Sequence, residues 1–347
     1  MQKFIHVGMP KTLSSALQES FFSKHEDIHF LGVGVGSLID YVSDPINRIF
    51  EILIPYSNND FYQLNKNTAM ADFDGEIERA FYNKKKWVGV SSEWLGFNFT
   101  PEMVDPDIKI KRLAEVVGSD AKILLLTRSN FPFVKSLWAE LVKVGLPKSF
   151  SEYCQYLWTF QDRNCLNEIL YDLQYSRLVR YFGKENIHIL ALENFRANDG
   201  SLINNDHQID LISELCRILD IEYPADFSLP LVNSSLDMKE LYHKLEFNKK
   251  YRHDFGNLIF EPSNLHRSRK QLEWLGVSED QDVFRDVKMK RFLLEQARLA
   301  AKRSDLEVSY ELPKVLEKNL SQLFIESNQR FEQLSGIKLP DQYFKAL

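Results

Sequence analysis

One short stretch near the start of the chain combines the residue types that bind phosphate groups. In "HVGMPKTLSSALQ", residues 6–18, an apolar run is followed by Lys11 and by the hydroxyl side chains of Thr12, Ser14 and Ser15. If a strand passes here into a helix, unpaired backbone N–H groups and the positive end of the helix dipole face one position, which favours an anion. Lys11 adds a full charge, and the hydroxyls add hydrogen-bond donors. The stretch therefore predicts a phosphate site.

The same stretch is also compatible with an ordinary strand-to-helix turn. In that interpretation Ser14 or Ser15 caps the helix and Lys11 is solvated. The stretch is not a Walker A loop, because no glycine precedes Lys11 and the G-x-x-x-x-G-K-[ST] pattern is absent. This segment alone leaves both interpretations open.

A second basic position occurs in "KILLLTRSNFPFVKSLW", residues 122–138. Arg128 ends a continuous apolar run, and Ser136 follows eight residues later, about two turns into a predicted helix. A guanidinium at a strand end and a hydroxyl beyond it can hold a second phosphate. Two separate phosphate sites predict a nucleotide that carries two separated phosphate groups.

The elements around these residues predict an α/β fold. Strands are expected at 3–8, 86–93, 121–128 and 186–195, and helical patterns at 12–25, 132–144 and 162–183, the last closed by Gly183. Strands that alternate with helices indicate right-handed βαβ units and a mostly parallel central sheet flanked by helices, in a P-loop-like three-layer arrangement. Ligands in such sheets bind at the carboxyl ends of the strands, so the loops after Gly8, Ser91, Arg128 and Glu193 are the places to search.

The chain is expected to form one domain. Its 347 residues suit one large α/β domain. The basic, weakly periodic stretch 230–312 is interpreted as lid or flap segments of the same domain, and 313–347 as a C-terminal helical region with a helix near 313–335.

Composition narrows the classes of function. The net charge of −6 gives no global attraction to nucleic acid or to anionic lipid, so an anion site must be local. The three cysteines, Cys154, Cys165 and Cys216, have neither disulfide-framework nor zinc-ligand spacing. We expect no integral membrane segment, no metal and a cytoplasmic location, because the sequence shows neither a signal-peptide pattern nor a long apolar run.

On its two phosphate motifs the chain resembles the PAPS-dependent sulfotransferases, of the bacterial type that modifies carbohydrates or other hydroxyl-bearing metabolites. "PKTLSSALQ" resembles the 5′-phosphosulfate loop of that family, P-K-[TS]-G-T-T-x-L-Q, and "TRSNFPFVKSLW" resembles its 3′-phosphate motif. Weaker similarities, such as "DIHFLG", "VGVSSEWL" and "IESNQRFEQLSG", extend over nearly the whole chain. The chain departs from the pattern at Leu13, where the family has a glycine that permits positive φ or close backbone approach to phosphate, and at Ser14 and Ser15, which replace threonines.

The resemblance implies transfer of a sulfuryl group from PAPS, the co-substrate, to a hydroxyl of a carbohydrate or other small or glycan acceptor, with PAP as product and without a metal. The protein mainly positions groups and neutralises charge in such an in-line displacement. The implied roles are the bridging and leaving-group oxygens for Lys11, the 5′-phosphate for Thr12, Ser14 and Ser15, the 3′-phosphate for Arg128 and Ser136, and the general base for Glu93.

Several further residues have a structural interpretation beside the functional one. Glu93 is a weak signal and could be only solvated or salt-bridged. His6 and His29 are expected to be packed or hydrogen-bonded, and His266 is a fallback base. Glu193 closes the fourth predicted strand and could bind substrate, but a structural contact with a neighbouring helix N-terminus is expected.

Two other patterns are set aside. The basic run Arg267, Arg269 and Lys270 could cover the 3′-phosphate or recruit an anionic acceptor, but most such runs are solvated faces. "GVGVG" at 32–36 does not have the dinucleotide-binding spacing, which argues against an NAD enzyme.

Two alternative functions remain. A P-loop-type small-molecule kinase is disfavoured by the missing Gly-Lys pair and the lack of a clear Walker B aspartate. A non-catalytic descendant of the sulfotransferase fold, which binds a nucleotide or a glycan without turnover, is compatible with Leu13. The sequence determines neither the acceptor nor the oligomeric state.

Overall fold

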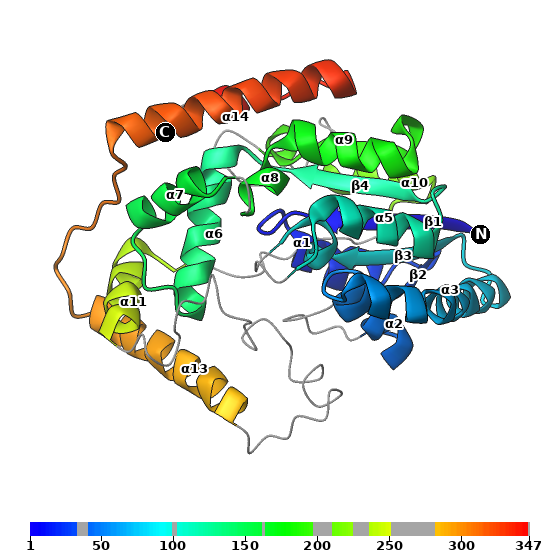
Figure 1. Ribbon diagram of the computed structural model, residues 1–347, viewed down its shortest axis with the longest axis horizontal. Helices are drawn as coiled ribbons and strands as arrows, with labels where there is room; N and C mark the ends of the chain where they lie inside the picture. The colour runs from blue at the N-terminus through cyan, green and yellow to red at the C-terminus, as the bar shows by residue number, and fades with distance from the viewer. Residues whose placement is uncertain are drawn as a thin grey trace.

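A parallel β-sheet lies between layers of helices in the right half of the view in Figure 1. The structure, a computed structural model, describes residues 1–32, 41–98, 103–161, 164–196, 210–224, 236–250 and 282–345, and only the backbone of 282–291. Within these residues the strands are β1 (Gln2–Gly8), β2 (Ile28–Phe30), β3 (Trp87–Ser92), β4 (Lys122–Thr127) and β5 (Ile187–Ala191). They lie in the order β2-β3-β1-β4-β5, and every neighbouring pair is parallel.

Four of these strands confirm the strands that the sequence predicts. The three-residue strand β2 was not predicted, because it is too short to show a pattern. The prediction for 186–195 was wrong at its end: β5 stops at Ala191, and Leu192–Phe195 form the 3₁₀ turn η4. This turn brings Glu193 back toward β4, where its carboxylate accepts a hydrogen bond from Ser129.

The register brings the ends of the three central strands together. β1 lies between β3 and β4, with Val7 opposite Ser92 and Gly8 opposite Leu126. The loop after Gly8, the start of the segment at Glu93 and the position of Arg128 therefore meet at one edge of the sheet.

Helices cover both faces of the sheet. On one face, strand residues such as Ile5, Val7 and Ile123 share a hydrophobic core with α3 (Asn59–Tyr82), α5 (Pro106–Val117) and α9 (Tyr171–Phe182). On the other face, Phe4 and Leu124 pack with α1 (Ser14–Leu17), the π-helical turn η1 (Gln18–Phe22) and α10 (Leu211–Leu219). Near-continuous apolar strands covered on both faces are the expected arrangement of a parallel sheet. The predicted three-layer α/β fold is confirmed.

Further helical elements surround this centre. They are α2 (Asp44–Arg48), η2 (Ile49–Leu53), α4 (Glu93–Gly96), α6 (Asn130–Val144), α7 (Phe150–Thr159), α8 (Leu166–Ile169), η3 (Lys184–Asn186), α11 (Met238–Lys250), α13 (Asp282–Ala301), α14 (Lys314–Ser335) and η6 (Asp341–Phe344). The described parts of 230–312 contain α11 and α13, which pack against each other. The lid or flap role expected for that stretch stays a prediction, and α14 confirms the predicted final helix.

The helix predicted over 162–183 was wrong in one respect, because two helices occupy this range. Leu170 has an extended backbone conformation between α8 and α9, and the side chain of Asn130 donates a hydrogen bond of 2.7 Å to the carbonyl of Ile169. That carbonyl would otherwise be available to a continuous helix. The helix does end at Gly183 as predicted, with φ +79°.

The C-terminal helix holds the beginning of α6 in place. α14 lies along α9 (Figure 1), and Asp172 of α9 accepts hydrogen bonds from Ser327 and from Arg330 at 2.5 and 2.6 Å. Asn328 of α14 donates to Asn130, the first residue of α6, at 2.8 Å. Because Asn130 follows Arg128 by two residues, α14 helps to fix the backbone that carries this arginine.

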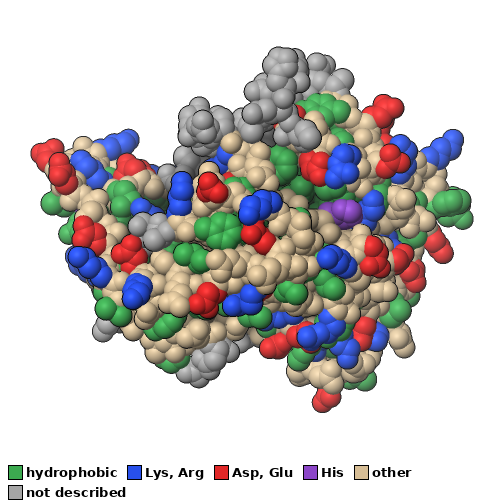
Figure 2. All heavy atoms as spheres, turned by 90° about the horizontal axis from the view of Figure 1, so that it is seen from above, with side chains coloured by type: hydrophobic (Ala, Val, Ile, Leu, Met, Phe, Trp, Pro, Cys, Tyr) green, Lys and Arg blue, Asp and Glu red, His purple; other side chains and the backbone are tan. Residues whose placement is uncertain are grey.

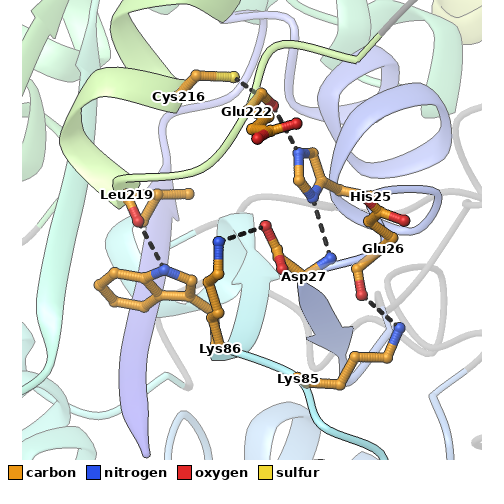
Figure 3. A network of polar contacts seen from close by, with 9 residues as sticks. His25, Glu26, Asp27, Lys85, Lys86, Cys216, Leu219 and Glu222 are labelled. Atoms are coloured by element: carbon orange, nitrogen blue, oxygen red, sulfur yellow. Dashed lines mark hydrogen bonds and ion pairs between the residues drawn. The ribbon is translucent and has the colours of Figure 1, made fainter.

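A polar network joins the end of α10 to the start of β3 and to the residues just before β2 (Figure 3). Trp87 Nε1 donates to the carbonyl of Leu219 at 2.7 Å, and His25 Nε2 lies 2.9 Å from the carbonyl of Glu222. His25 Nδ1 accepts from the backbone N–H of Asp27 at 3.2 Å, so Nε2 carries the proton and donates it to Glu222. This histidine is therefore structural.

The surface carries both signs of charge. Figure 2 shows acidic and basic side chains interspersed over the face it presents, without a large region of one sign. Within the described residues we find no helix with the length and hydrophobicity needed to traverse a lipid bilayer.

Candidate functional site

The loop between β1 and α1 keeps the conformation that a glycine would favour. Leu13 has φ 67° and ψ 15°, in the left-handed region, and Lys11 has φ 64°. A residue other than glycine in this left-handed conformation costs on the order of 1–2 kcal/mol of folding free energy. Leu13 therefore adopts a positive φ of the kind that glycine adopts without strain, and this strain lowers the stability of the folded state.

Two of the predicted hydroxyls point into the loop. Thr12 is fully buried, and its Oγ1 donates to the carbonyl of Met9 at 2.6 Å. Ser14 is also buried, with its Oγ 3.4 Å from the same carbonyl. The hydroxyl hydrogen of Thr12 is thus engaged within the loop, and the contact of this hydroxyl with a 5′-phosphate stays a prediction. Ser15 is partly exposed on α1.

Gly8 allows the loop to approach β3 closely. A Cβ atom at this position would lie 2.8 Å from Ser14 Oγ and 3.6 Å from Glu93 Cγ. The first distance is shorter than any ordinary contact of a side chain. The space beside Gly8 is therefore shared by Ser14 and Glu93, which brings the predicted base next to the predicted phosphate loop.

Lys11 forms an ion pair with a residue of α6. Its Nζ lies 2.6 Å from Glu140 Oε2, and Lys143 Nζ lies 3.0 Å from the same oxygen. Burial alone would raise the pKa of Glu140, but the ammonium groups of Lys11 and Lys143 hold it below its usual value. Glu140 is therefore a stable carboxylate beside the loop.

Glu93 has the opposite tendency. Burial, reinforced by the charge of Glu140, raises its pKa to about 7, although Lys11 and a hydrogen bond from Ser14 work in the other direction. Two neighbouring carboxylates with pKa values driven apart are typical of acid–base sites. At neutral pH Glu93 exists in both protonation states, which suits a general base.

Arg128 reaches the same loop from β4. Its Nη1 donates to the carbonyl of Lys11 at 3.3 Å, and the hydroxyl of Tyr171 bridges its backbone carbonyl and N–H at 2.5 and 3.1 Å. Burial is the main reason why the pKa of Arg128 is lowered, and the nearby charge of Arg196 is the next. The two basic motifs of the sequence thus meet at one edge of the sheet.

Ser136 is less closely joined to these groups. It is partly buried on α6, one turn before Glu140 and so on the same face as the partner of Lys11. In the part of the chain that the structure describes, no hydrogen bond joins Ser136 to Arg128 or Lys11.

The residues expected to be structural have such contacts. His6 is buried beside Phe22, its Nδ1 lies 2.7 Å from Ser91 Oγ, and burial lowers its pKa to about 3. His29 pairs with Glu76 at 2.9 Å. Glu193 Oε1 accepts from the backbone N–H of Ser129, the N-cap of α6, at 2.8 Å, which confirms the predicted helix contact.

Some expectations fall on residues outside the described ranges. These are His266, the basic run Arg267, Arg269 and Lys270, and most of the glycine-containing stretch 32–36. In the described residues, no group of three or more His, Cys, Asp or Glu side chains is arranged to hold a metal ion.

Sequence reasoning missed two residues that border the site. Glu140 could have been found from its spacing, since it follows Ser136 by four residues in a predicted helix. Arg196 could have been found as the first residue after the predicted strand 186–195, at the same carboxyl edge as Arg128.

Among the comparisons with known proteins, only the one with solved structures finds similar chains. No protein-family model matches the chain, and no curated protein matches it. Among solved structures, the chain is similar to a crystal structure of a sulfotransferase from Alicyclobacillus acidocaldarius, with 16% identity over 99% of this chain and 98% of the other and a TM-score of 0.46. A similarity at this level supports no conclusion about activity.

Proposed function

We propose that the protein is a sulfotransferase that moves the sulfuryl group of PAPS to a hydroxyl of a carbohydrate or another small or glycan acceptor. The observation that carries this proposal is the meeting of Lys11, Arg128 and Glu93 at one edge of the sheet. Lys11 and Arg128 are joined by the 3.3 Å hydrogen bond from the guanidinium to the Lys11 carbonyl, and Glu93 lies beside Gly8 and Ser14. Two cations and a base with a pKa near neutrality are the groups that this reaction needs.

In the proposed reaction the acceptor oxygen attacks the sulfur atom in line. The new S–O bond forms as the bond between sulfur and the bridging phosphate oxygen breaks, and the acceptor proton passes to Glu93. Negative charge grows on the departing 5′-phosphate, where Lys11 neutralises it. Charge stabilisation at the position where charge develops is the largest contribution to catalysis in sites of this type.

Binding of the co-substrate requires Lys11 to exchange its partner. Its ammonium group is paired with Glu140, whose Oε2 also accepts from Lys143. When a phosphosulfate takes Lys11, Lys143 still compensates the charge of Glu140. The exchange therefore leaves no uncompensated carboxylate, which keeps its cost low.

At the loop, the 5′-phosphate is proposed to contact Lys11, the hydroxyls of Thr12, Ser14 and Ser15, and backbone N–H groups. Without a ligand the hydroxyl of Thr12 donates to the carbonyl of Met9, so it must turn away from this carbonyl to reach the phosphate. Arg128, with Ser136 on α6, is proposed to take the 3′-phosphate, as the sequence predicts.

The test is calorimetric binding of adenosine 3′,5′-bisphosphate in magnesium-free buffer, followed by turnover of PAPS with a panel of hydroxyl acceptors. We expect wild-type binding that is weakened at least tenfold in Lys11→Ala and in Arg128→Ala. Lys338→Ala and Arg217→Ala are matched controls, because these side chains are 90% and 70% exposed. They should bind like the wild type.

The outcomes separate the candidate functions. Absence of wild-type binding contradicts the proposal. Binding without turnover on any acceptor in the panel favours the non-catalytic descendant. Tighter binding of ATP in a parallel titration with magnesium favours the kinase.

A further inference from the structure

Arg128 has a second guanidinium as its neighbour. The positive charge of Arg196 is the second cause, after burial, of the lowered pKa of Arg128. Arg180, Arg217 and Arg330 are ion-paired with carboxylates at 2.6 Å. Within the described residues, neither Arg128 nor Arg196 forms such a pair. Two cations held together in this way stabilise an anion that binds between them.

Arg196 also has an unused donor. Its Nε is buried and has no hydrogen-bond partner among the described residues. A buried charged N–H group without a partner is costly, and such groups occur where a ligand or water completes the site. The missing partner is an acceptor atom.

The topology places both arginines at the same edge. β4 and β5 pair in parallel with Thr127 opposite Ala191, and Arg128 follows directly on β4. After β5 the turn η4 occupies Leu192–Phe195, and Arg196 follows this turn. Each guanidinium thus comes from the segment after the carboxyl end of one of two adjacent strands.

Glu193 compensates only part of this charge. Its carboxylate raises the pKa of Arg128, while its Oε1 is engaged by the N–H of Ser129 at 2.8 Å. Against two guanidinium groups, one carboxylate leaves a net positive charge. A phosphate monoester, with a charge near −2 at neutral pH and three acceptor oxygens, supplies both the charge and the missing acceptor.

We propose that Arg196 completes a two-guanidinium site for a phosphate monoester with Arg128, and that it selects nucleotides with a 3′-phosphate over those without one. The inference rests on the proposed function, since it assigns the 3′-phosphate of PAPS and PAP to this pair. It adds a specificity-determining residue that neither sequence motif contains.

The experiment compares adenosine 3′,5′-bisphosphate with adenosine 5′-monophosphate by calorimetry for the wild type, Arg196→Gln and Arg196→Lys. We expect Arg196→Gln to weaken bisphosphate binding about ten- to a hundredfold, the loss expected for hydrogen bonds to a charged group. Binding of the monophosphate should change less than about threefold, since only the 3′-phosphate contact is removed. Arg217→Gln is the matched control, because its guanidinium is ion-paired with Glu214 at 2.6 Å on the surface.

Arg196→Lys separates a binding role from a folding role. It keeps the positive charge but removes the Nε donor and the planar fork, so the preference for the bisphosphate should fall about three- to tenfold. Thermal unfolding of each variant checks that the fold is retained. If Arg196→Gln does not fold, the lysine variant decides, and an unchanged preference in it overturns the inference.

The failure of the inference can be distinguished from the failure of the proposed function. If the wild type binds the bisphosphate but Arg196→Gln weakens both nucleotides equally, the assignment of Arg196 is wrong and the proposed function stands. If the wild type binds neither nucleotide, the proposed function itself fails. If the two arginines bind phosphate, inorganic phosphate should compete with adenosine 3′,5′-bisphosphate less effectively in Arg196→Gln than in the wild type.

Discussion

Lys11 Nζ lies 2.6 Å from Glu140 Oε2, and the same oxygen accepts a hydrogen bond of 3.0 Å from Lys143. The carboxylate of Glu140 is therefore an anion bound to Lys11 at the loop after β1. It also raises the pKa of Glu93, while Lys11 lowers it. One residue of α6 is thus linked to both of the groups that the proposed reaction uses.

Removal of this carboxylate should strengthen anion binding. Glu140→Gln frees Lys11 from a competing partner, and we expect a roughly two- to fivefold tighter binding of adenosine 3′,5′-bisphosphate, since pairs of this exposure contribute at most about 1 kcal/mol. Calorimetry at 50 and 300 mM salt measures the effect. Glu326→Gln, on an exposed part of α14, is the control. Weaker binding in Glu140→Gln would mean that the ion pair orients Lys11 for the ligand.

Glu93 should control the pH dependence of turnover. With a pKa of about 7, its base form is lost as the pH falls below neutrality, so the rate should decline on the acid side. Glu93→Gln should lower turnover about 10²- to 10⁴-fold and change bisphosphate binding less than threefold. Turnover near the wild-type rate in this variant would exclude Glu93 as the base.

The same shift has a consequence for stability. The pKa of Glu93 is higher in the folded state than in the unfolded state, so its contribution to stability is fully present below the unfolded pKa and is lost as the pH rises toward 7. Relative to Glu93→Gln, the free energy of unfolding of the wild type should fall between about pH 4.5 and 7.5, by on the order of 1–3 kcal/mol. Urea unfolding at several pH values tests this, and parallel curves would show that the shift is absent.

Leu13 should store backbone strain. Leu13→Ala and Leu13→Gly both remove the side chain, but only glycine relieves the φ of 67°. We expect the glycine variant to be about 1 kcal/mol more stable than the alanine variant. Equal stability by urea unfolding, or greater stability of the alanine variant, would contradict the prediction.

Gly8 should tolerate no Cβ while Ser14 keeps its hydroxyl. Gly8→Ala places a methyl group 2.8 Å from Ser14 Oγ, and overpacking of this kind costs about 1–3 kcal/mol. In the background Ser14→Ala the cost should be smaller, and a double-mutant cycle on unfolding free energies measures the coupling. Additive effects would place the conflict with another atom, such as His6 Cε1 at 3.3 Å.

The strands of the centre could be predicted because their signal is local. The apolar runs that became β1, β3 and β4 are buried on both faces, so each reads as a continuous hydrophobic stretch. Elements shaped by distant contacts were mispredicted. Strand β5 ends shortly before Glu193, whose carboxylate accepts a hydrogen bond from the N–H of Ser129. The break before α9 coincides with the hydrogen bond that Asn130 donates to the carbonyl of Ile169.

The same distinction between local signals and distant contacts applies to the residues of the site. Lys11, Arg128 and Glu93 could be selected from the sequence, since each follows a recognisable strand and parallel strands present their carboxyl ends at one edge. The sequence alone could not show that Lys11 pairs with Glu140, that Thr12 donates inward to Met9, or that Arg196 lies close to Arg128. These relationships join residues from different elements or depend on the folded geometry of the loop. Only the packing of α6 and β5 against the central strands decided which charges meet, because charge interactions depend on distance and burial in three dimensions.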